Sequence, residues 1–399
     1  MKTVTLVKDD AKCAGCGACM TACPVQAISM ETDACGHLYP VINEGTCIHC
    51  GKCVQICDFS KAAGKKKPLE AYAAAGKDER LVQESASGGV FATLAAGCIA
   101  AGGKVAGAVM DFTQGQTDVY HLLSDTTEDL RRMQGSKYVQ SKAWRSYQDV
   151  VRAVKDGEKV LFSGTPCQVA AVKKLTGDPE NLITVDLVCH GVPSEKMLNE
   201  YLQILRKRFG GSIAGLQFRD KSCRKQFCAR INVAGKRDYL LRSHYLSFYK
   251  YFLEGAIYRE SCYACPYASM ERVADITLGD YWGIETFHGE DMACGCMPRR
   301  EDWSCVLVNT EKGKHFMEKH SQSLAMYPTK AEWIAENNRQ LNSPSVKGDK
   351  REAILENYSK GGYRSVETEF VQSLGGPIRF YLKMLKNLHA NQKVKKLVK

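Results

Sequence analysis

The sequence has no long uninterrupted apolar stretch. Its longest apolar run, residues 88–110, contains several glycines and Lys104, which is atypical of a membrane-spanning helix. It predicts instead a helix, a turn at Gly102-Gly103 and a strand. The N-terminal segment MKTVTLVKDDAKC contains no apolar core like that of a secretory signal. We therefore expect a cytoplasmic protein that is neither secreted nor inserted in a membrane.

The sequence also has no strong excess of basic charge outside its C-terminal end. The formal net charge is +11, but seven basic and no acidic residues follow Glu369, so the remainder carries only +4. A balance this mild does not indicate nucleic-acid binding. A G-x-G-x-x-G fingerprint with a downstream acidic residue is absent too, so a conventional NAD site is not predicted.

Cysteine, by contrast, is abundant, with 19 residues in the chain. A disulfide framework has little use among reduced thiols, and an odd number of cysteines does not favour one. Ligation of metal ions or iron–sulfur clusters is the better expectation.

Residues 1–60 contain two copies of the pattern C-x2-C-x2-C-x3-C, the second 34 residues after the first. This spacing is typical of bacterial ferredoxins with two 4Fe–4S clusters, in which the fourth cysteine of each run binds the other cluster. Tetrahedral zinc sites do not explain three thiolates spaced so closely. One departure is Asp58, which stands where proline is usual, and Cys35 lies outside the pattern. The spacing predicts one cluster bound by Cys13, Cys16, Cys19 and Cys57, and a second bound by Cys47, Cys50, Cys53 and Cys23.

The remaining chain divides into three predicted segments. Residues 61–80 contain a lysine run and an alanine-rich stretch, which predict a linker or a short exposed helix. Residues 81–330 alternate between strand and helix patterns, which predicts an α/β domain with a mainly parallel sheet. Residues 331–399 predict a helical extension with a basic tail. The clearest elements of the α/β domain are strands over 159–162 and 181–187 and helices over 168–175 and 195–209.

Four further cysteines form a possible third site. Cys167 and Cys189 each follow a predicted parallel strand, at the edge where open α/β sheets bind ligands, and Cys262 and Cys265 form a C-x2-C pair. Their spacing alone leaves several interpretations open. These are a third cluster, a four-thiolate zinc site, a Cys167 nucleophile with His190 as its base, or cysteines with unrelated roles.

Two segments fit a flavin pocket. SASGGVF (85–91) places Ser87, Gly88 and Gly89 at the start of a helix, where backbone N–H groups can bind a pyrophosphate. GSKYVQS (135–141) offers Lys137 as a charge and Tyr138 as a stacking ring. A tight turn before a buried helix explains the first segment equally well.

The chain resembles the family of coenzyme F420-reducing hydrogenase and formate dehydrogenase β subunits. The resemblance extends over about residues 1–345. The family includes members that carry an N-terminal two-cluster ferredoxin. It implies an FAD at Ser87, Gly88, Gly89, Lys137 and Tyr138, and a third 4Fe–4S cluster at Cys167, Cys189, Cys262 and Cys265. That coenzyme F420 is a substrate is implied by the resemblance alone. The matching segments, in chain order, are ESASGGV, GSKYVQS, SGTPCQVAAV, DLVCHGVPS, CYACPY and DITLGDYWG.

Together these features predict an iron–sulfur flavoprotein oxidoreductase that exchanges electrons between a ferredoxin-type or other redox partner and a small organic substrate. Two alternatives stay open: an F420-dependent dehydrogenase or reductase subunit, and a non-catalytic electron-transfer subunit of a larger complex. No catalytic residue is predicted. The pattern from residue 377 onward predicts a helix. This helix packs one apolar stripe on the domain, or it contacts an anionic membrane surface or an acidic partner. The sequence leaves open whether the protein forms a homo-oligomer. Cys98 is expected in the core, and no role is assigned to Cys223, Cys228, Cys294, Cys296 and Cys305.

Overall fold

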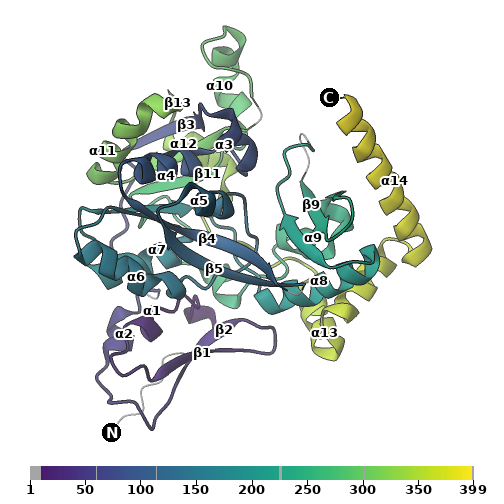
Figure 1. Cartoon of the computed structure of the whole chain (residues 1–399), viewed down its shortest axis with the longest axis horizontal. Helices are drawn as coiled ribbons and strands as arrows, with labels where there is room; N and C mark the ends of the chain where they lie inside the picture. The colour runs from purple at the N-terminus through teal and green to yellow at the C-terminus, as the bar shows by residue number, and fades with distance from the viewer. Residues whose placement is uncertain (1–9, 60, 114, 224–226, 301, 398–399) are drawn as a thin grey trace.

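The computed structural model describes residues 10–59, 61–113, 115–223, 227–300 and 302–397. At the N-terminal end, residues 10–59 form a small separate lobe, named here the N-terminal module (Figure 1). Its two strands pair as an antiparallel hairpin, and its two short helices begin at Gly17 and Gly51, which both adopt positive φ. The elements of the module are α1 (Ala18–Thr21), β1 (Ile28–Thr32), β2 (Leu38–Ile42) and α2 (Lys52–Ile56).

The centre of the molecule is an eight-stranded mixed sheet with the order β13-β3-β12-β11-β7-β6-β4-β5. Its four inner strands, β11, β7, β6 and β4, are parallel, and the outer pairs are antiparallel. The predicted α/β domain with a parallel core is therefore confirmed. The strands are β3 (Glu70–Gly76), β4 (Lys104–Thr113), β5 (Gln116–Ser124), β6 (Val160–Gly164), β7 (Leu182–Leu187), β11 (Ile276–Asp280), β12 (Ser304–Val308) and β13 (Leu324–Pro328).

Helices cover both faces of this sheet, which together with them is named the core domain. Leu161 of β6 packs on the side of α4 and α11, whereas Val160 and Phe162 pack on the side of α6 and α7. This alternation explains why the parallel strands are apolar throughout. The helices are α3 (Glu79–Glu84), α4 (Val90–Ala100), α5 (Thr127–Met133), α6 (Trp144–Lys155), α7 (Pro166–Thr176), α10 (Ile284–Ala293), α11 (Glu311–His320) and α12 (Ala331–Asn337).

A second apolar core lies beside the large sheet, around a three-stranded antiparallel sheet that the sequence did not predict. The C-terminal helices pack against it, as Figure 1 shows on the right. Its elements are α8 (Glu195–Phe209), β8 (Ile213–Gln217), β9 (Cys228–Val233), β10 (Tyr239–Arg242), α9 (Ser247–Leu253), α13 (Arg351–Ser373) and α14 (Gly376–Leu397). Short 3-10 turns are η1 (Asp10–Lys12), η2 (Ser243–Tyr245), η3 (Glu260–Ala264), η4 (Ser321–Ser323) and η5 (Arg339–Leu341).

The segment predicted as a linker, residues 61–80, requires a correction. Residues 70–76 form β3, which lies inside the large sheet between β12 and β13. Ala73, Ala74 and Ala75 are fully buried there. Alanine has a weak strand propensity, so the local sequence alone predicts a linker here and not a strand. Pairing with two strands and close packing of small side chains hold it in the sheet.

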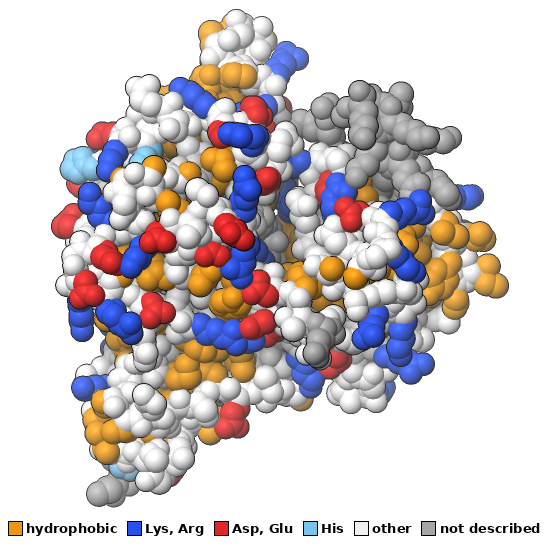
Figure 2. Space-filling model, viewed as in Figure 1, with side chains coloured by type: hydrophobic (Ala, Val, Ile, Leu, Met, Phe, Trp, Pro, Cys, Tyr) orange, Lys and Arg blue, Asp and Glu red, His pale blue; other side chains and the backbone are white. Residues whose placement is uncertain are grey.

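The C-terminal helix packs one stripe on the second apolar core and leaves another exposed. In α14 the side chains of Phe380, Met384 and Leu388 are buried, whereas Ile378 and Leu382 are 79% and 56% exposed. Figure 2 shows hydrophobic side chains gathered along the described part of this helix. The side chains of the lysines from residue 393 onward lie outside the described residues. No helix in the part of the chain that the structure describes is both long enough and apolar enough to cross a bilayer.

These two faces of α14 predict different effects on stability. Phe380 is fully buried against Phe370 and Arg208, so Phe380→Ala is expected to lower the free energy of unfolding by about 3–5 kcal/mol. Leu382→Ala on the exposed face serves as the control and is expected to change it by no more than about 0.5 kcal/mol. Urea unfolding of both variants measures the difference, and equal losses would contradict this packing.

Candidate functional site

The first cysteine site lies between the N-terminal module and the core domain. Cys13, Cys16, Cys19 and Cys57 line one cavity, the set that the spacing predicts for one cluster. Burial raises the pKa of the Cys19 thiol to about 12, and the neighbouring Cys13 and Cys57 add to this rise. Four thiols crowded at one site, three of them half-buried and Cys57 exposed, are costly as thiolates unless a cation compensates them.

The second cysteine site lies at the outer end of the N-terminal module. Cys23, Cys47, Cys50 and Cys53 line a separate cavity there, together with residues of both hairpin strands. Cys50 is exposed, as is Ile48 beside it. Each of the two sites thus has one exposed cysteine, Cys57 in the first and Cys50 in the second. In both sites the fourth cysteine comes from the other run, as expected, and cluster ligation by these residues stays a prediction.

The third cysteine site lies at the carboxyl end of the parallel strands. Cys167 begins α7 after β6, Cys189 follows β7, and Cys262 and Cys265 lie in and just after the turn η3. All four line a large cavity of about 600 Å³, named here the central cavity. Burial raises the pKa of Cys167 to about 11 and that of Cys262 to about 12. The four predicted residues are thus brought together by segments far apart in the sequence.

The surroundings of these four thiols can be compared with those of a zinc site and of a Cys167–His190 pair. Among the described residues, no three Cys, His, Asp or Glu side chains converge as ligands of one metal ion do. In a cubane each cysteine binds a different iron, so the thiolates surround a space instead of converging on a point. The Cys167 thiol lies 3.2 Å from the Thr165 hydroxyl, and no hydrogen bond among the described residues joins it to His190. Ligation of a third cluster by these four cysteines stays a prediction.

Four of the five predicted flavin residues line the central cavity: Ser87, Gly89, Lys137 and Tyr138. Gly88 packs instead against the sheet, where its N–H donates to the Ser304 hydroxyl. A Cβ on Gly88 would lie 2.6 Å from the Ala74 carbonyl oxygen. Gly88 is therefore needed for close packing of this loop, and the sequence alone does not separate that role from ligand binding.

Two of these residues are already engaged by the protein. The Lys137 ammonium donates to the carbonyl oxygens of Arg132, Met133 and Gln134, at the end of α5. The Tyr138 ring stacks on Phe252, with ring centroids 4.1 Å apart. Lys137 thus caps a helix, and Tyr138 presents one edge of an aromatic cluster to the cavity wall.

Comparison with known proteins agrees with this geometry. Residues 12–61 match the model of the 4Fe–4S dicluster domain. Residues 157–332 match the model for the C terminus of the coenzyme F420 hydrogenase/dehydrogenase beta subunit. In chain order, a segment similar to an iron–sulfur dicluster domain thus precedes a segment similar to the C terminus of the F420 hydrogenase/dehydrogenase beta subunit. The resemblance predicted from the sequence motifs is therefore confirmed.

Two individual proteins are similar to this chain. An uncharacterized protein of Methanocaldococcus jannaschii, MJ1349, is 25% identical over 210 residues, which are 44% of this chain and 56% of the relative. The match thus spans little more than half of that relative's length. A chain in the solved xenon-derivatized F420-reducing NiFe hydrogenase complex of Methanosarcina barkeri is 16% identical, with a TM-score of 0.46. That match covers 75% of this chain and 95% of the other.

The first cysteine site and the central cavity share a wall. Ala14, Phe59, Cys167 and Tyr267 line both spaces. Gln140 of the core domain donates from Nε2 to the carbonyl oxygens of Ala14 and Gly15, at 3.0 and 3.1 Å. The two domains therefore meet at the cysteine sites, whose cavities have these four lining residues in common.

Several residues of the central cavity were missed at the sequence level. Gln134 directly precedes the GSKYVQS segment, and its Oε1 is buried without a hydrogen-bond partner among the described residues. Arg219 is ion-paired with Asp280 at 2.9 Å, and its guanidinium lies over the rings of Phe227 and Trp282. Gln134 could have been found from its neighbouring motif. Arg219 comes from a segment with no motif, so only the fold reveals it.

The remaining cysteines have different surroundings. Cys98 and Cys305 are buried, as expected for Cys98, and Cys35 is half-buried beside the second apolar core. Cys223 and Cys228 form a disulfide before and at the start of β9, which departs from the expectation of reduced thiols. Cys294 and Cys296 are exposed after α10.

His121 of the central cavity gives a pH-dependent prediction. Burial lowers its pKa to about 4, although the Ser163 carbonyl, 2.9 Å from Nε2, opposes this shift. The unfolded chain, with an ordinary histidine pKa, binds a proton below about pH 6.5 that the folded chain does not bind. Stability should therefore fall as the pH drops from about 6.5 towards 4. His121→Gln is expected to reduce the loss between about pH 7 and pH 5 by about 2 kcal/mol in urea unfolding. An unchanged pH dependence would contradict this assignment.

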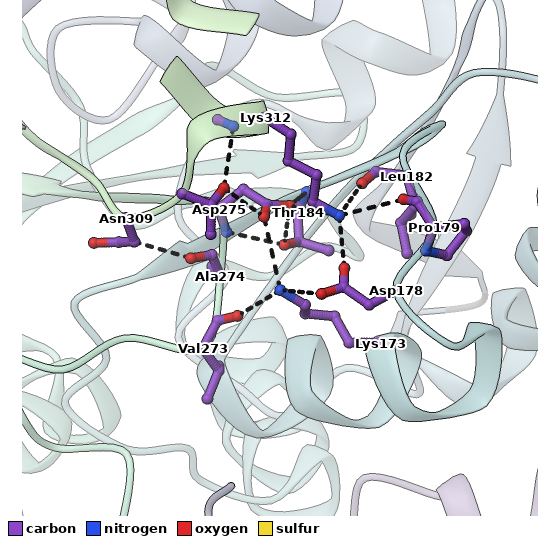
Figure 3. Close-up of polar contacts among 12 residues, drawn as sticks. Lys173, Asp178, Pro179, Leu182, Thr184, Val273, Ala274, Asp275, Asn309 and Lys312 are labelled. Atoms are coloured by element: carbon purple, nitrogen blue, oxygen red, sulfur yellow. Dashed lines mark hydrogen bonds and ion pairs between the residues drawn. The ribbon is translucent and has the colours of Figure 1, made fainter. Parts of the chain in front are cut away.

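Just before β11, the buried carboxylate of Asp275 lies at the centre of a polar network that does not line the central cavity. Figure 3 shows Asp275 between Lys173 and Lys312, with its oxygens 3.7 and 3.6 Å from the two ammonium groups. Thr184 donates to the same carboxylate from its backbone N–H and its hydroxyl, at 2.8 and 2.7 Å. This network ties β7 to the segment before β11. Its role is to hold the strands that position the third cysteine site.

Proposed function

We propose that this protein is an iron–sulfur flavoprotein oxidoreductase, which passes electrons between a ferredoxin-type partner and an organic substrate or hydride carrier. The observation that supports this most directly is the succession of four-cysteine cavities that leads from the exposed end of the N-terminal module to the central cavity. Residues 1–60 are proposed as the dicluster domain and residues 81–330 as the flavin and cluster domain. The helical extension from 331 completes the fold.

The chain's own residues define three proposed cluster sites. Cys13, Cys16, Cys19 and Cys57 would hold one 4Fe–4S cluster, and Cys23, Cys47, Cys50 and Cys53 a second. Cys167, Cys189, Cys262 and Cys265 would hold the third at the wall of the central cavity. The gathering of each set around one cavity and the burial that raises the pKa of Cys19, Cys167 and Cys262 support this assignment.

The central cavity is proposed to hold FAD, with Ser87, Gly89 and Tyr138 at its wall. A flavin exchanges either one or two electrons, so it links clusters to substrates that exchange hydride equivalents. The unpartnered Oε1 of the buried Gln134 and the apolar rings around the cavity support a planar, polar-edged ligand of this kind. Lys137 would then support the site by capping α5, and Gly88 would support it by packing on the sheet.

The first test is the iron, acid-labile sulfide, zinc and flavin content of anaerobically purified protein. About twelve irons and one FAD per chain are expected. About eight irons without flavin would reduce the function to electron transfer by a non-catalytic subunit. Zinc in place of four irons would overturn the third cluster.

A second candidate function is turnover of coenzyme F420 as the hydride carrier, which the matched family model favours by its description. The loaded protein, mixed with reduced F420 and a one-electron dye, should then oxidise the coenzyme. Failure with F420 but flavin reduction by another organic donor would retain the oxidoreductase and exclude this candidate.

Contact with a membrane surface is also proposed, through the exposed residues Ile378, Leu382 and Leu385 and the lysines near them. Co-sedimentation of the full chain with anionic vesicles tests it, and Leu382→Ser/Leu385→Ser should abolish the binding. Equal sedimentation of this variant would exclude the contact.

A further inference from the structure

Arg259 is a fully buried side chain at the junction of the two domains. It immediately precedes the turn η3 that carries Cys262, and its Nε donates to the Cys13 carbonyl oxygen at 2.7 Å. Its guanidinium lies 4.0 Å from the ring centroid of Tyr39, in the hairpin of the N-terminal module. One side chain of the core domain thus reaches the backbone of the first cysteine site.

The charge of Arg259 is not balanced by a carboxylate among the described residues. Other buried arginines have such a partner, as Arg272 has Asp186 at 2.9 Å and Arg351 has Glu260 at 3.0 Å. Arg259 Nη1 instead lies 3.4 Å from the amide oxygen of Gln140, and Nη2 has no hydrogen-bond partner in the described structure. A buried cation without a counter-charge is costly. Its position therefore requires negative charge from another source.

Cysteines of both sites lie beside Arg259. Its Nε donates to the carbonyl oxygen of Cys13, and the backbone N–H of Cys262 donates to the Arg259 carbonyl oxygen at 3.0 Å. Cys13 belongs to the first cysteine site, whereas Cys167 and Cys262 belong to the third. Arg259 is thus hydrogen-bonded to a cysteine-bearing segment of each site, and clusters bound by thiolates there would supply the missing negative charge.

We propose that Arg259 is a positioning residue that raises the reduction potential of the cluster held by Cys13, Cys16, Cys19 and Cys57, and of the cluster at the third cysteine site. This inference rests on the proposed function, since it requires that both sites hold clusters. Reduction adds one negative charge to a buried cluster, and a fixed positive charge in a poorly solvated interior stabilises that added charge. Arg259 thereby stabilises the reduced state of the two clusters at the junction between the two domains.

The test is a redox titration of the anaerobically purified full chain, followed by the spectra of the reduced clusters. Arg259→Gln removes the charge but leaves an amide that can donate to the Cys13 carbonyl. At a fixed potential its ratio of reduced to oxidised cluster is expected to fall at least tenfold, which corresponds to about 59 mV for a one-electron couple. Arg259→Lys keeps the charge and should stay closer to the unmodified protein.

Two further variants make the result decisive. Gln140→Glu places a carboxylate beside the guanidinium and is expected to lower the same potentials without removing Arg259. Arg351→Met removes a buried arginine that has its own carboxylate partner, and is expected to leave the potentials unchanged. Clusters present with unchanged potentials in Arg259→Gln or, where that variant does not hold iron, in Gln140→Glu would overturn the inference. Absence of clusters from the unmodified protein would overturn the proposed function instead.

Discussion

Replacing Cys167 with serine is expected to remove about four of about twelve irons per chain. Cys167 lies at the start of α7 and lines both the first cysteine site and the central cavity. A serine hydroxyl is a poor iron ligand, so the third site should lose its cluster, whereas the eight N-terminal cysteines are unchanged. Iron and sulfide analysis and the spectrum of the reduced protein measure the loss.

The matched control for this variant is Cys98→Ser. Cys98 is a buried cysteine in α4 that lines none of the three cysteine sites. It should keep the full iron content. Retention of about twelve irons in Cys167→Ser would show that Cys167 is not a ligand.

Replacing Asp275 with alanine is expected to lower the free energy of unfolding by about 3–5 kcal/mol. The carboxylate is fully buried and accepts hydrogen bonds from Thr184 and Thr310. Without it, Lys173 and Lys312 lose a buried counter-charge and the Thr184 N–H loses its acceptor. Urea unfolding of the apoprotein measures this effect free of any change in cluster content.

Asp178→Ala is the control for that variant. Asp178 contacts the same two lysines, at 2.9 and 2.6 Å, but its side chain is 37% exposed. Solvent screens such a pair, so its removal should cost about 1 kcal/mol or less. Equal losses in the two variants would contradict the importance of the buried carboxylate.

Much of the core domain could be predicted because its signals are local. The helix predicted over 195–209 has those bounds in the structure, and the strand predicted over 181–187 is β7, Leu182–Leu187. Strand and helix alternation follows from apolar patterns within single segments. The strand β3 and the sheet of β8, β9 and β10 were missed, because pairing between distant segments decides them.

The cysteine sites show the same division. The N-terminal sets follow from spacing within two short runs. The rule that ligands gather at the carboxyl ends of parallel strands places Cys167 and Cys189, whereas only the family resemblance joins Cys262 and Cys265 to them. The flavin residues are harder to predict. The Lys137 ammonium is directed to the end of α5 and Gly88 to the sheet, and neither direction can be read from the motif. Arg219 has no sequence signal at all.

The wall that Phe59 and Tyr267 share between the first cysteine site and the central cavity has a kinetic consequence. A separate ferredoxin must find its acceptor by diffusion, whereas here the two domains are held together at a fixed effective concentration. The internal transfer rate should therefore be independent of protein concentration and insensitive to ionic strength. Dilution and added salt should slow only the encounter with an external partner at the exposed end near Cys50.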